Sequence, residues 1–271
     1  MTNPEVSLVI PAFNSASYLA GNVDRVRAFF ERAGIDGEVV VADDGSVDGT
    51  ADSVIQSERV RVLRLPHRGK GAAVRAGMAA TTGEICGFTD ADLPYGVEPL
   101  PLAVSYIRER RYHAVIGDRT LPGSSYASTG LLRTAVSEFA SFSFRTLVTG
   151  GIYDTQCGFK IFRGDVGREV FRLSRISGFA IDVELIYLLL KYRLDVKRIP
   201  VRLERNEPST VRVVRDSATA FRDIASIRWN WAVGRYRAPV LVDLLQAELH
   251  RDVEEAAGRP AVSTGAPDRT A

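Results

Sequence analysis

Two aspartates separated by one residue, Asp90 and Asp92, follow the apolar run Ile85-Cys86-Gly87 and precede Leu93-Pro94. This pattern predicts a buried strand that ends at a turn. Open α/β sheets bind their ligands at the carboxyl ends of the strands. Two carboxylates at such an edge suit a hard divalent cation, Mg²⁺ or Mn²⁺, which also takes oxygens from a substrate phosphate. A pair of solvated turn aspartates is the alternative interpretation.

A second pair of carboxylates, Asp43 and Asp44, ends the valine-rich run 38–42 and precedes Gly45-Ser46. We expect this run to be a strand that ends at the same sheet edge as Asp90. An aspartate there can accept hydrogen bonds from a nucleobase N–H or from ribose hydroxyls. For these residues in isolation, a turn followed by a helix cap is the simpler interpretation.

Lys70 lies between Gly69 and Gly71, at the predicted start of a helix rich in small residues. The spacing is not that of a nucleoside-triphosphatase phosphate loop, because no glycine lies five residues before Gly69. A helix N-terminus that carries a lysine is still able to attract a diphosphate.

The elements that must position these residues alternate between strand and helix from residue 6 onward. This alternation predicts an α/β fold, a mostly parallel sheet flanked by helices and joined by right-handed crossovers. A C-terminal helical extension follows. The expected strands are 6–10, 38–42, 59–65, 85–88, 113–116, 157–162 and 196–203. The expected helices begin after Asn14-Ser15 and then cover 48–57, 69–82, 97–110, 131–148, 181–192 and 215–237.

The amino-acid composition limits the classes of protein to which this chain can belong. The 271 residues are 45% apolar and 25% charged, which is ordinary for a soluble globular chain, and the net charge of +2 gives no argument for a nucleic-acid partner. Cys86 and Cys157 lie in apolar runs, so we expect reduced core thiols. No signal peptide or membrane span is apparent. We expect a cytoplasmic protein, peripheral on the inner face of the membrane, with a catalytic domain over 1–212, a helical segment over 213–251 and a disordered tail over 252–271.

Together, the motifs resemble a known family. Val9-Ile10-Pro11-Ala12-Phe13-Asn14, the stretch 42–50, Gly69-Lys70-Gly71 and Thr89-Asp90-Ala91-Asp92 occur in the order and spacing of family 2 glycosyltransferases of the GT-A (Rossmann-like) fold. The later stretches 116–119, 154–160 and 178–185 resemble polyprenyl- and dolichyl-phosphate sugar synthases, especially the dolichyl-phosphate glucosyltransferase branch.

The resemblance implies a nucleotide-sugar donor such as UDP-glucose, and inverting, metal-dependent transfer of a hexose, most of all glucose, to a polyprenyl phosphate. Asp90 and Asp92 would hold the donor diphosphate through Mg²⁺ or Mn²⁺, and the metal would offset the charge that develops on the leaving group. The positions that the resemblance assigns to the donor are Pro11, Ala12, Asn14, Asp43, Asp44, Lys70, Asp90 and Ala91.

On the acceptor side, the resemblance implies that Arg119 and Arg133 hold the acceptor phosphate, because the arginine fork binds phosphate oxygens in pairs. Arg212 would replace a lysine that the family usually carries where this chain has Thr210. Asp182 occupies the family's acceptor-side acid position and would deprotonate a hydroxyl nucleophile. A phosphate acceptor hardly needs that base, because its second pKa is about 6. Taken together, the catalytic residues that the resemblance implies are Asp182, Asp92 and Arg119.

Other interpretations stay open at this point. The sequence 93–96 after Asp92 and the loss of the late lysine depart from the family pattern, so a soluble hydroxyl acceptor such as a nucleoside is the alternative. A non-enzymatic nucleotide-sugar-binding module is a third hypothesis, against which the intact Asp-x-Asp argues. The apolar helix 131–148 and the tryptophan-bearing basic segment 215–237 fit peripheral membrane contact, or else core or homodimer packing.

Overall fold

The protein was analysed as a computed structural model that describes residues 3–124, 154, 157–204 and 213–258. The chain divides into two compact units, Met1–Arg237 and Ala238–Ala271. The second unit contains the helix α9, Pro239–Gly258, which continues past Asp252, where we expected a disordered tail to begin. The expected boundary between residues 212 and 213 falls inside the first unit and stays a prediction.

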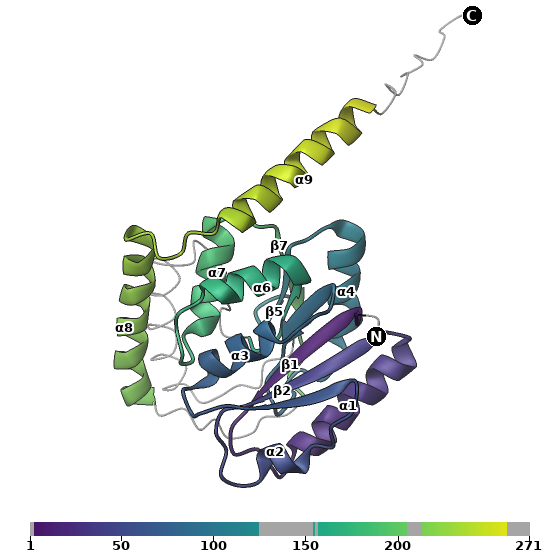
Figure 1. The fold of residues 1–271 in the computed structure, drawn as a ribbon, viewed down its shortest axis with the longest axis vertical. Helices are drawn as coiled ribbons and strands as arrows, with labels where there is room; N and C mark the ends of the chain where they lie inside the picture. The colour runs from purple at the N-terminus through teal and green to yellow at the C-terminus, as the bar shows by residue number, and fades with distance from the viewer. Residues whose placement is uncertain (1–2, 125–153, 155–156, 205–212, 259–271) are drawn as a thin grey trace, which may run out of the picture. The chain divides into compact units, whose positions relative to one another are not determined.

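The first unit is built on a seven-stranded mixed sheet with the order β3-β2-β1-β4-β6-β5-β7 (Figure 1). Only β6 runs antiparallel to its neighbours β4 and β5, and the remaining pairs are parallel, which confirms the predicted mostly parallel sheet. The strands are β1 (Val6–Ala12), β2 (Gly37–Asp43), β3 (Val60–Arg64), β4 (Ile85–Phe88), β5 (Ala114–Asp118), β6 (Lys160–Arg163) and β7 (Val196–Pro200).

Helices cover both faces of this sheet, and β1 is buried along its whole length as a result. Leu8 and Ile10 point to the core shared with α1 (Leu19–Ala33) and α4 (Pro99–Arg110). Val9 points to the opposite face, where it packs closely against Gly77 of α3 (Lys70–Ala79). The alternation of side chains along a strand thus gives one sheet two apolar cores.

Several elements differ from the sequence prediction, among them β1, which continues through Pro11 to Ala12, and β7, which ends at Pro200. Helix α6 (Gly164–Leu173) lies in a stretch to which the sequence analysis assigned no element. The structure shows why Gly167 is small, since a Cβ there would lie 2.6 Å from the Cys86 sulfur on β4. Helix α2 is only Thr50–Ser53, shorter than expected because Val54 is already extended, and β6 begins three residues later than predicted, at Lys160.

The C-terminal part of the first unit adds α7 (Ile181–Lys191), which contacts α6 and α8 (Val213–Ala232). Among the described residues, no helix is both long and apolar enough to cross a membrane. The predicted helix 131–148 lies outside the described residues. Both cysteines are buried and free, as predicted.

Candidate active site

The candidate site lies at the carboxyl edge of β1, β2 and β4. These three strands are neighbours in the sheet, with β1 between β2 and β4, so the residues that follow them meet at one edge. Asn14 follows β1, Asp44 follows β2 and Asp90 follows β4. The chain after β1 first adds β2 and β3 on one side of β1 and then places β4 on its other side. Ligands of open α/β sheets bind at such a switch point in the strand order.

Asp43 and Asp44, which the sequence could not tell apart, have different environments. Both carboxylate oxygens of Asp44 accept backbone N–H bonds, Oδ1 from Arg68 and Oδ2 from Gly69, each at 2.8 Å. The imidazole Nδ1 of His67 lies 2.8 Å from Asp44 Oδ2. Asp44 therefore fixes the loop before α3. Asp43 is equally buried, but its Oδ1 has no hydrogen-bond partner in the structure, so this oxygen is an acceptor still to be satisfied.

The loop after β1 is tied to the loop after β2. Asn14 adopts a positive φ of 50°, its N–H donates to Ser46 Oγ at 2.8 Å, and its Oδ1 accepts from Val47 N–H at 3.1 Å. Pro11 and Ala12 are buried in β1 itself, and the Ala12 carbonyl accepts the Asp44 N–H at 2.8 Å. The three residues predicted to line a nucleotide pocket thus lie beside the Asp43–Asp44 pair.

Phe13 adds an aromatic surface at the same place. Its ring stacks on His67 with a centroid distance of 4.3 Å and an interplanar angle of 22°, while the Phe13 residue remains 46% exposed. Sequence reasoning did not assign a role to either ring.

A chain of alternating charges connects the Asp-x-Asp turn to α7. The Lys70 ammonium lies 2.6 Å from Asp90 Oδ1 and 3.5 Å from Asp182 Oδ2. The other Asp182 oxygen, Oδ1, accepts a hydrogen bond from Lys160, which also donates to the Cys157 carbonyl at 2.6 Å. Lys160 is completely buried and Asp182 is 2% exposed, so this end of the network lies in the protein interior, whereas the Asp90 side chain is 30% exposed.

The surroundings of Lys70 hold its side chain as a cation. Burial of the Lys70 ammonium opposes its charge, but the carboxylates of Asp90 and Asp182 outweigh burial and hold the pKa of Lys70 above its ordinary value. The ammonium groups of Lys70 and Lys160 lie 5.8 and 5.5 Å from the centroid of the buried Phe88 ring. Both ammonium groups therefore lie within cation–π distance of one aromatic ring at the end of β4.

Glycines allow the close approach of these elements. A Cβ on Gly158 would collide with the Asp90 carboxylate, so only glycine leaves room for that side chain. Gly69 adopts a φ of +101°, and its Cα faces the Ser177 carbonyl on the loop before α7.

The turn that carries Asp92 is anchored by its backbone. The Leu93 N–H donates to the Asp90 carbonyl at 3.0 Å, and Asn22 Nδ2 of α1 donates to the buried Ala91 carbonyl at 2.8 Å. Asp92 is half-buried within this turn. Asp90 and Asp92 offer the carboxylate oxygens that a hard divalent cation prefers. The described residues do not gather three His, Cys, Asp or Glu side chains around a metal position, so a cation here needs further oxygens from a ligand.

Arg119, predicted to hold an acceptor phosphate, is paired with Asp154. Its Nε and Nη2 donate to the two Asp154 oxygens at 2.8 and 2.7 Å, and its backbone N–H adds a third bond at 2.8 Å. The Arg119 side chain is 27% exposed. Its role toward an acceptor stays a prediction. Arg133 and Arg212 lie outside the described residues.

Glu184, two residues after Asp182, faces a different neighbourhood. Its carboxylate accepts the backbone N–H groups of Arg175 and Ile176 at 2.8 and 3.0 Å, and the Tyr236 hydroxyl donates to it. Burial raises the pKa of Glu184 above its ordinary value despite these bonds. Glu184 therefore stabilises the turn before α7 and is not a member of the network formed by Asp90, Lys70, Asp182 and Lys160.

Sequence reasoning missed the parts that Lys160, Asp154 and Gly158 play. All three lie in the stretch 154–160, which contributed to the sequence prediction only as part of the family resemblance. The available signal was a lysine directly after Gly158-Phe159 and before an apolar pair, Ile161-Phe162, because a lysine inside a buried strand requires a carboxylate partner.

Residues 7–171 match the model of the family described as Glycosyl transferase family 2. The dolichyl-phosphate beta-glucosyltransferase of Drosophila melanogaster is 32% identical over 252 residues, which cover 86% of this chain and 77% of that protein. The protein of the same name from Saccharomyces cerevisiae is 29% identical over 257 residues, covering 86% and 76%.

Solved structures share the fold at lower identity. Mannosyl-3-phosphoglycerate synthase from Rubrobacter xylanophilus has a TM-score of 0.65 and 22% identity, covering 87% of this chain and 78% of that one. Glucosyl-3-phosphoglycerate synthase from Mycobacterium tuberculosis, solved in complex with Mn²⁺, UDP and glucosyl-3-phosphoglycerate, has a TM-score of 0.62 and 20% identity, covering 83% and 80%. The family match and the relatives confirm the resemblance drawn from the ordered motifs: the chain belongs to glycosyl transferase family 2.

Proposed function

We propose that this protein transfers glucose from a nucleotide sugar to the phosphate of a polyprenyl phosphate, with inversion at the sugar carbon. A phosphate oxygen of the acceptor forms the new bond to C1 of the glucose, the bond from C1 to the donor diphosphate breaks, and a nucleoside diphosphate leaves. The proposal is supported by relatives named dolichyl-phosphate beta-glucosyltransferase over most of the chain.

The donor half of the proposal rests on the edge formed by β1, β2 and β4. The unpartnered Oδ1 of Asp43 is an acceptor suited to the N–H of a nucleobase such as uracil. Asp90 and Asp92 would hold Mg²⁺ or Mn²⁺ together with the donor diphosphate. When bound, that cation supplies Lewis-acid and electrostatic stabilisation of the leaving group. Lys70, whose ammonium lies 2.6 Å from Asp90, is the chain's own cation beside the same position.

The observation that carries the choice of acceptor is the environment of Asp182. Its two oxygens are engaged by the ammonium groups of Lys70 and Lys160, and the residue is 2% exposed. A carboxylate held in this way is poorly placed to take a proton from an acceptor hydroxyl. A phosphate acceptor is mostly dianionic at neutral pH and requires no such base. The geometry therefore favours the phosphate acceptor over a soluble hydroxyl acceptor.

A donor-by-acceptor assay tests the proposal. The purified chain with Mg²⁺ or Mn²⁺ is given UDP-glucose or GDP-mannose, with and without a short polyprenyl phosphate, and products are identified by mass spectrometry. We expect glucosyl lipid from UDP-glucose alone. Slow donor hydrolysis without transfer to the lipid would contradict the acceptor assignment. Transfer from GDP-mannose instead would contradict the assignment of the sugar.

Two variants sharpen this assay. Asp92→Asn should abolish transfer, and full activity in that variant would contradict the assigned metal position. Asp182→Asn should retain a large part of the turnover if the acceptor is a phosphate. If Asp182→Asn still folds and binds donor but has no turnover, the result would indicate a hydroxyl acceptor that needs a base.

A further inference from the structure

The loop between α6 and α7, residues 174–180, packs against the backbone on either side of Lys70. A Cβ on Gly69 would lie 2.6 Å from the Ser177 carbonyl oxygen, and a Cβ on Gly71 would lie 2.5 Å from another carbonyl oxygen of this loop. A side chain at either glycine would therefore collide with the loop backbone. A shift of the loop would move Lys70 relative to the carboxylates that its ammonium contacts.

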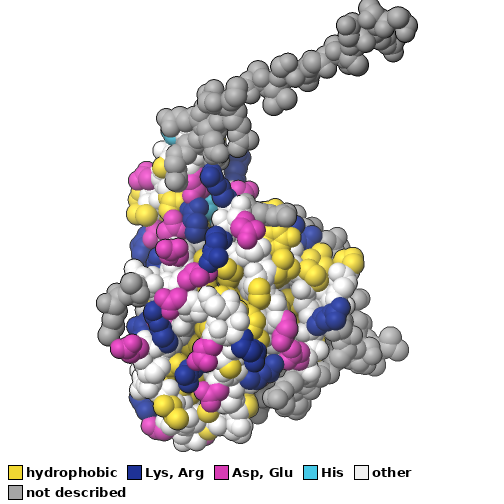
Figure 2. Space-filling model, turned by 90° about the vertical axis from the view of Figure 1, so that its right-hand side faces the viewer, with side chains coloured by type: hydrophobic (Ala, Val, Ile, Leu, Met, Phe, Trp, Pro, Cys, Tyr) yellow, Lys and Arg dark blue, Asp and Glu magenta, His cyan; other side chains and the backbone are white. Residues whose placement is uncertain are grey.

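Glu184 of α7 holds this loop in place. Its two carboxylate oxygens accept the backbone N–H groups of Arg175 and Ile176 at 2.8 and 3.0 Å. From α3, Arg75 Nη1 donates to the Ile176 carbonyl at 3.2 Å. Carboxylates on the face in Figure 2 lie among lysine and arginine side chains, whereas Glu184 is completely buried. A buried carboxylate is costly unless hydrogen bonds satisfy it, so the charge of Glu184 and the position of the loop depend on each other.

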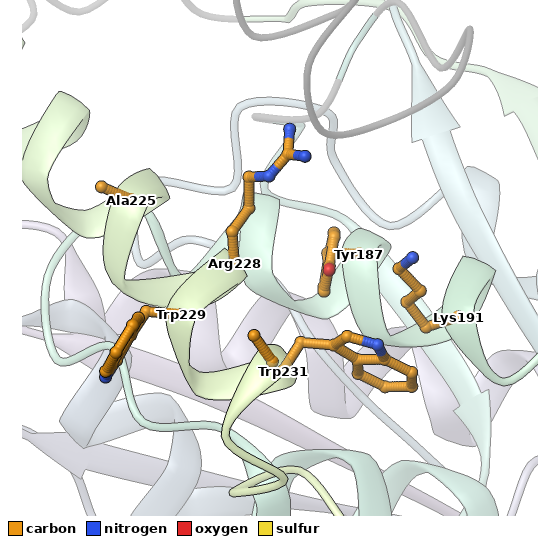
Figure 3. Close-up of a pocket in the computed structure, with 7 residues that line it drawn as sticks. Tyr187, Lys191, Ala225, Arg228, Trp229 and Trp231 are labelled. Atoms are coloured by element: carbon orange, nitrogen blue, oxygen red, sulfur yellow. The ribbon is translucent and has the colours of Figure 1, made fainter.

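Tyr236, which follows α8, supplies a further hydrogen bond to Glu184. The tyrosine is 2% exposed, and its hydroxyl donates to Glu184 Oε1. Its backbone carbonyl accepts a hydrogen bond from the Tyr192 hydroxyl at the end of α7. The Trp231 ring of α8 lies edge-on to Tyr187 and Tyr192 at centroid distances of 6.0 and 5.7 Å, and Figure 3 shows Trp231 extending toward Tyr187. The packing of α8 on α7 thus brings the Tyr236 hydroxyl to Glu184.

We propose that Tyr236 is a positioning residue for the transfer reaction, which acts on Lys70 through Glu184 and the loop 174–180. The hydroxyl orients the Glu184 carboxylate, the carboxylate fixes the loop backbone, and the loop fixes the start of α3. Lys70 is thereby held where its ammonium can face the charge that develops on the leaving diphosphate. The inference rests on the proposed function, because it concerns the step in which that diphosphate leaves.

Hydrogen–deuterium exchange of the full chain without donor or acceptor tests the hydrogen-bond link separately from transfer. In Tyr236→Phe, the amides of Arg175 and Ile176 should exchange at least about tenfold faster, because the buried Glu184 carboxylate loses a donor and holds them less firmly. Tyr192→Phe is the matched control, since it removes a hydroxyl that donates to the Tyr236 carbonyl but leaves the Tyr236 hydroxyl in place. Both amides should keep their protection in that control. Unchanged exchange in Tyr236→Phe overturns the inference, whether or not the wild type is active.

Steady-state kinetics of transfer test the route through Lys70. Tyr236→Phe should lower kcat about tenfold and change the donor KM by less than about twofold, because Lys70 would act as charge develops on the leaving group. In a Lys70→Gln background, the same substitution should lower kcat by less than about twofold, because the group through which it acts is absent. Tyr192→Phe should keep the wild-type kcat.

Two kinetic results overturn the positioning role of Tyr236. One is a loss of kcat on Tyr236→Phe that is as large in the Lys70→Gln background as in the wild type. The other is an equal loss in Tyr192→Phe, which would indicate a general effect on the packing of α8. A wild type without any transfer would contradict the proposed function and, with it, the positioning role, while faster exchange in Tyr236→Phe would still support the link from Tyr236 to the loop.

Discussion

Replacement of Lys160 by methionine should destabilise the protein strongly, because the lysine is completely buried and its ammonium pairs with Asp182. Removing one partner of a buried ion pair typically costs about 3–5 kcal/mol. Lys70 remains 3.5 Å from Asp182, and at an effective dielectric constant of about 20 its attraction is about 5 kcal/mol before desolvation. Since Lys70 is shared with Asp90, it offsets only part of the loss. We therefore expect Lys160→Met to lower the free energy of unfolding by about 3 kcal/mol.

The assay is urea unfolding followed by tryptophan fluorescence, with a double-mutant cycle. Lys160→Met and Asp182→Leu should each cost about 3 kcal/mol, whereas the double variant should cost little more than either alone. Arg64→Gln is the control, because its partner Asp52 is exposed and no change of the midpoint is expected. If the two single effects add to within about 0.5 kcal/mol, the buried pair is not coupled and the reasoning fails.

Three further predictions concern other parts of the same unit. Because burial raises the native pKa of Glu184 above 4.5, the folded state holds that proton more tightly than the unfolded state. The unfolding free energy should therefore fall as pH rises through the interval from 4.5 to the raised native value, and urea titrations of Glu184→Gln should lack that component of the slope. Burial also raises the pKa of both cysteine thiols to about 12, so Ellman's reagent should react only after denaturant is added, and rapid labelling of the native protein would contradict this burial. Gly158→Ala should displace the Asp90 carboxylate and lower transfer at least tenfold with the fold retained, whereas Gly21→Ala, where a Cβ meets nothing within 4 Å, should leave transfer unchanged.

Most of the fold was predictable because its signals are local. Apolar runs that lead into turn residues mark β1, β2 and β4 in the sequence, and Gly69 precedes the small-residue helix α3, although β1 continues two residues past its predicted end at residue 10. Helix α6 was missed for a physical reason. Its glycines serve the packing of the helix against β4, and a glycine that permits close approach cannot be distinguished by sequence from one that permits a turn.

The candidate site was predictable in its residue types but not in its pairings. The sequence predicted that Asp43 and Asp44 end a strand, yet only the fold shows that Asp44 binds the backbone before α3 and leaves Asp43 with an unpartnered oxygen. Lys160 gave no signal as a site residue, because lysines are usually exposed. Its burial depends on Asp182, 22 positions away in the chain, so the pair exists only once β6 and α7 have packed.

The charge chain gives a reason for burying lysines at this strand end. Lys70 and Lys160 balance Asp90 and Asp182, so the network is compensated before any ligand binds. A nucleotide-sugar diphosphate that arrives with a divalent cation adds little net charge to it. In the proposed transfer, the diphosphate gains negative charge as it leaves. The Lys70 side chain lies beside Asp90 and is 14% exposed, so it is accessible from that position, whereas the Lys160 side chain is completely buried. In that transfer, Lys70 is thus a cation that the described residues would offer to the leaving group, while Lys160 holds the Asp182 carboxylate in place.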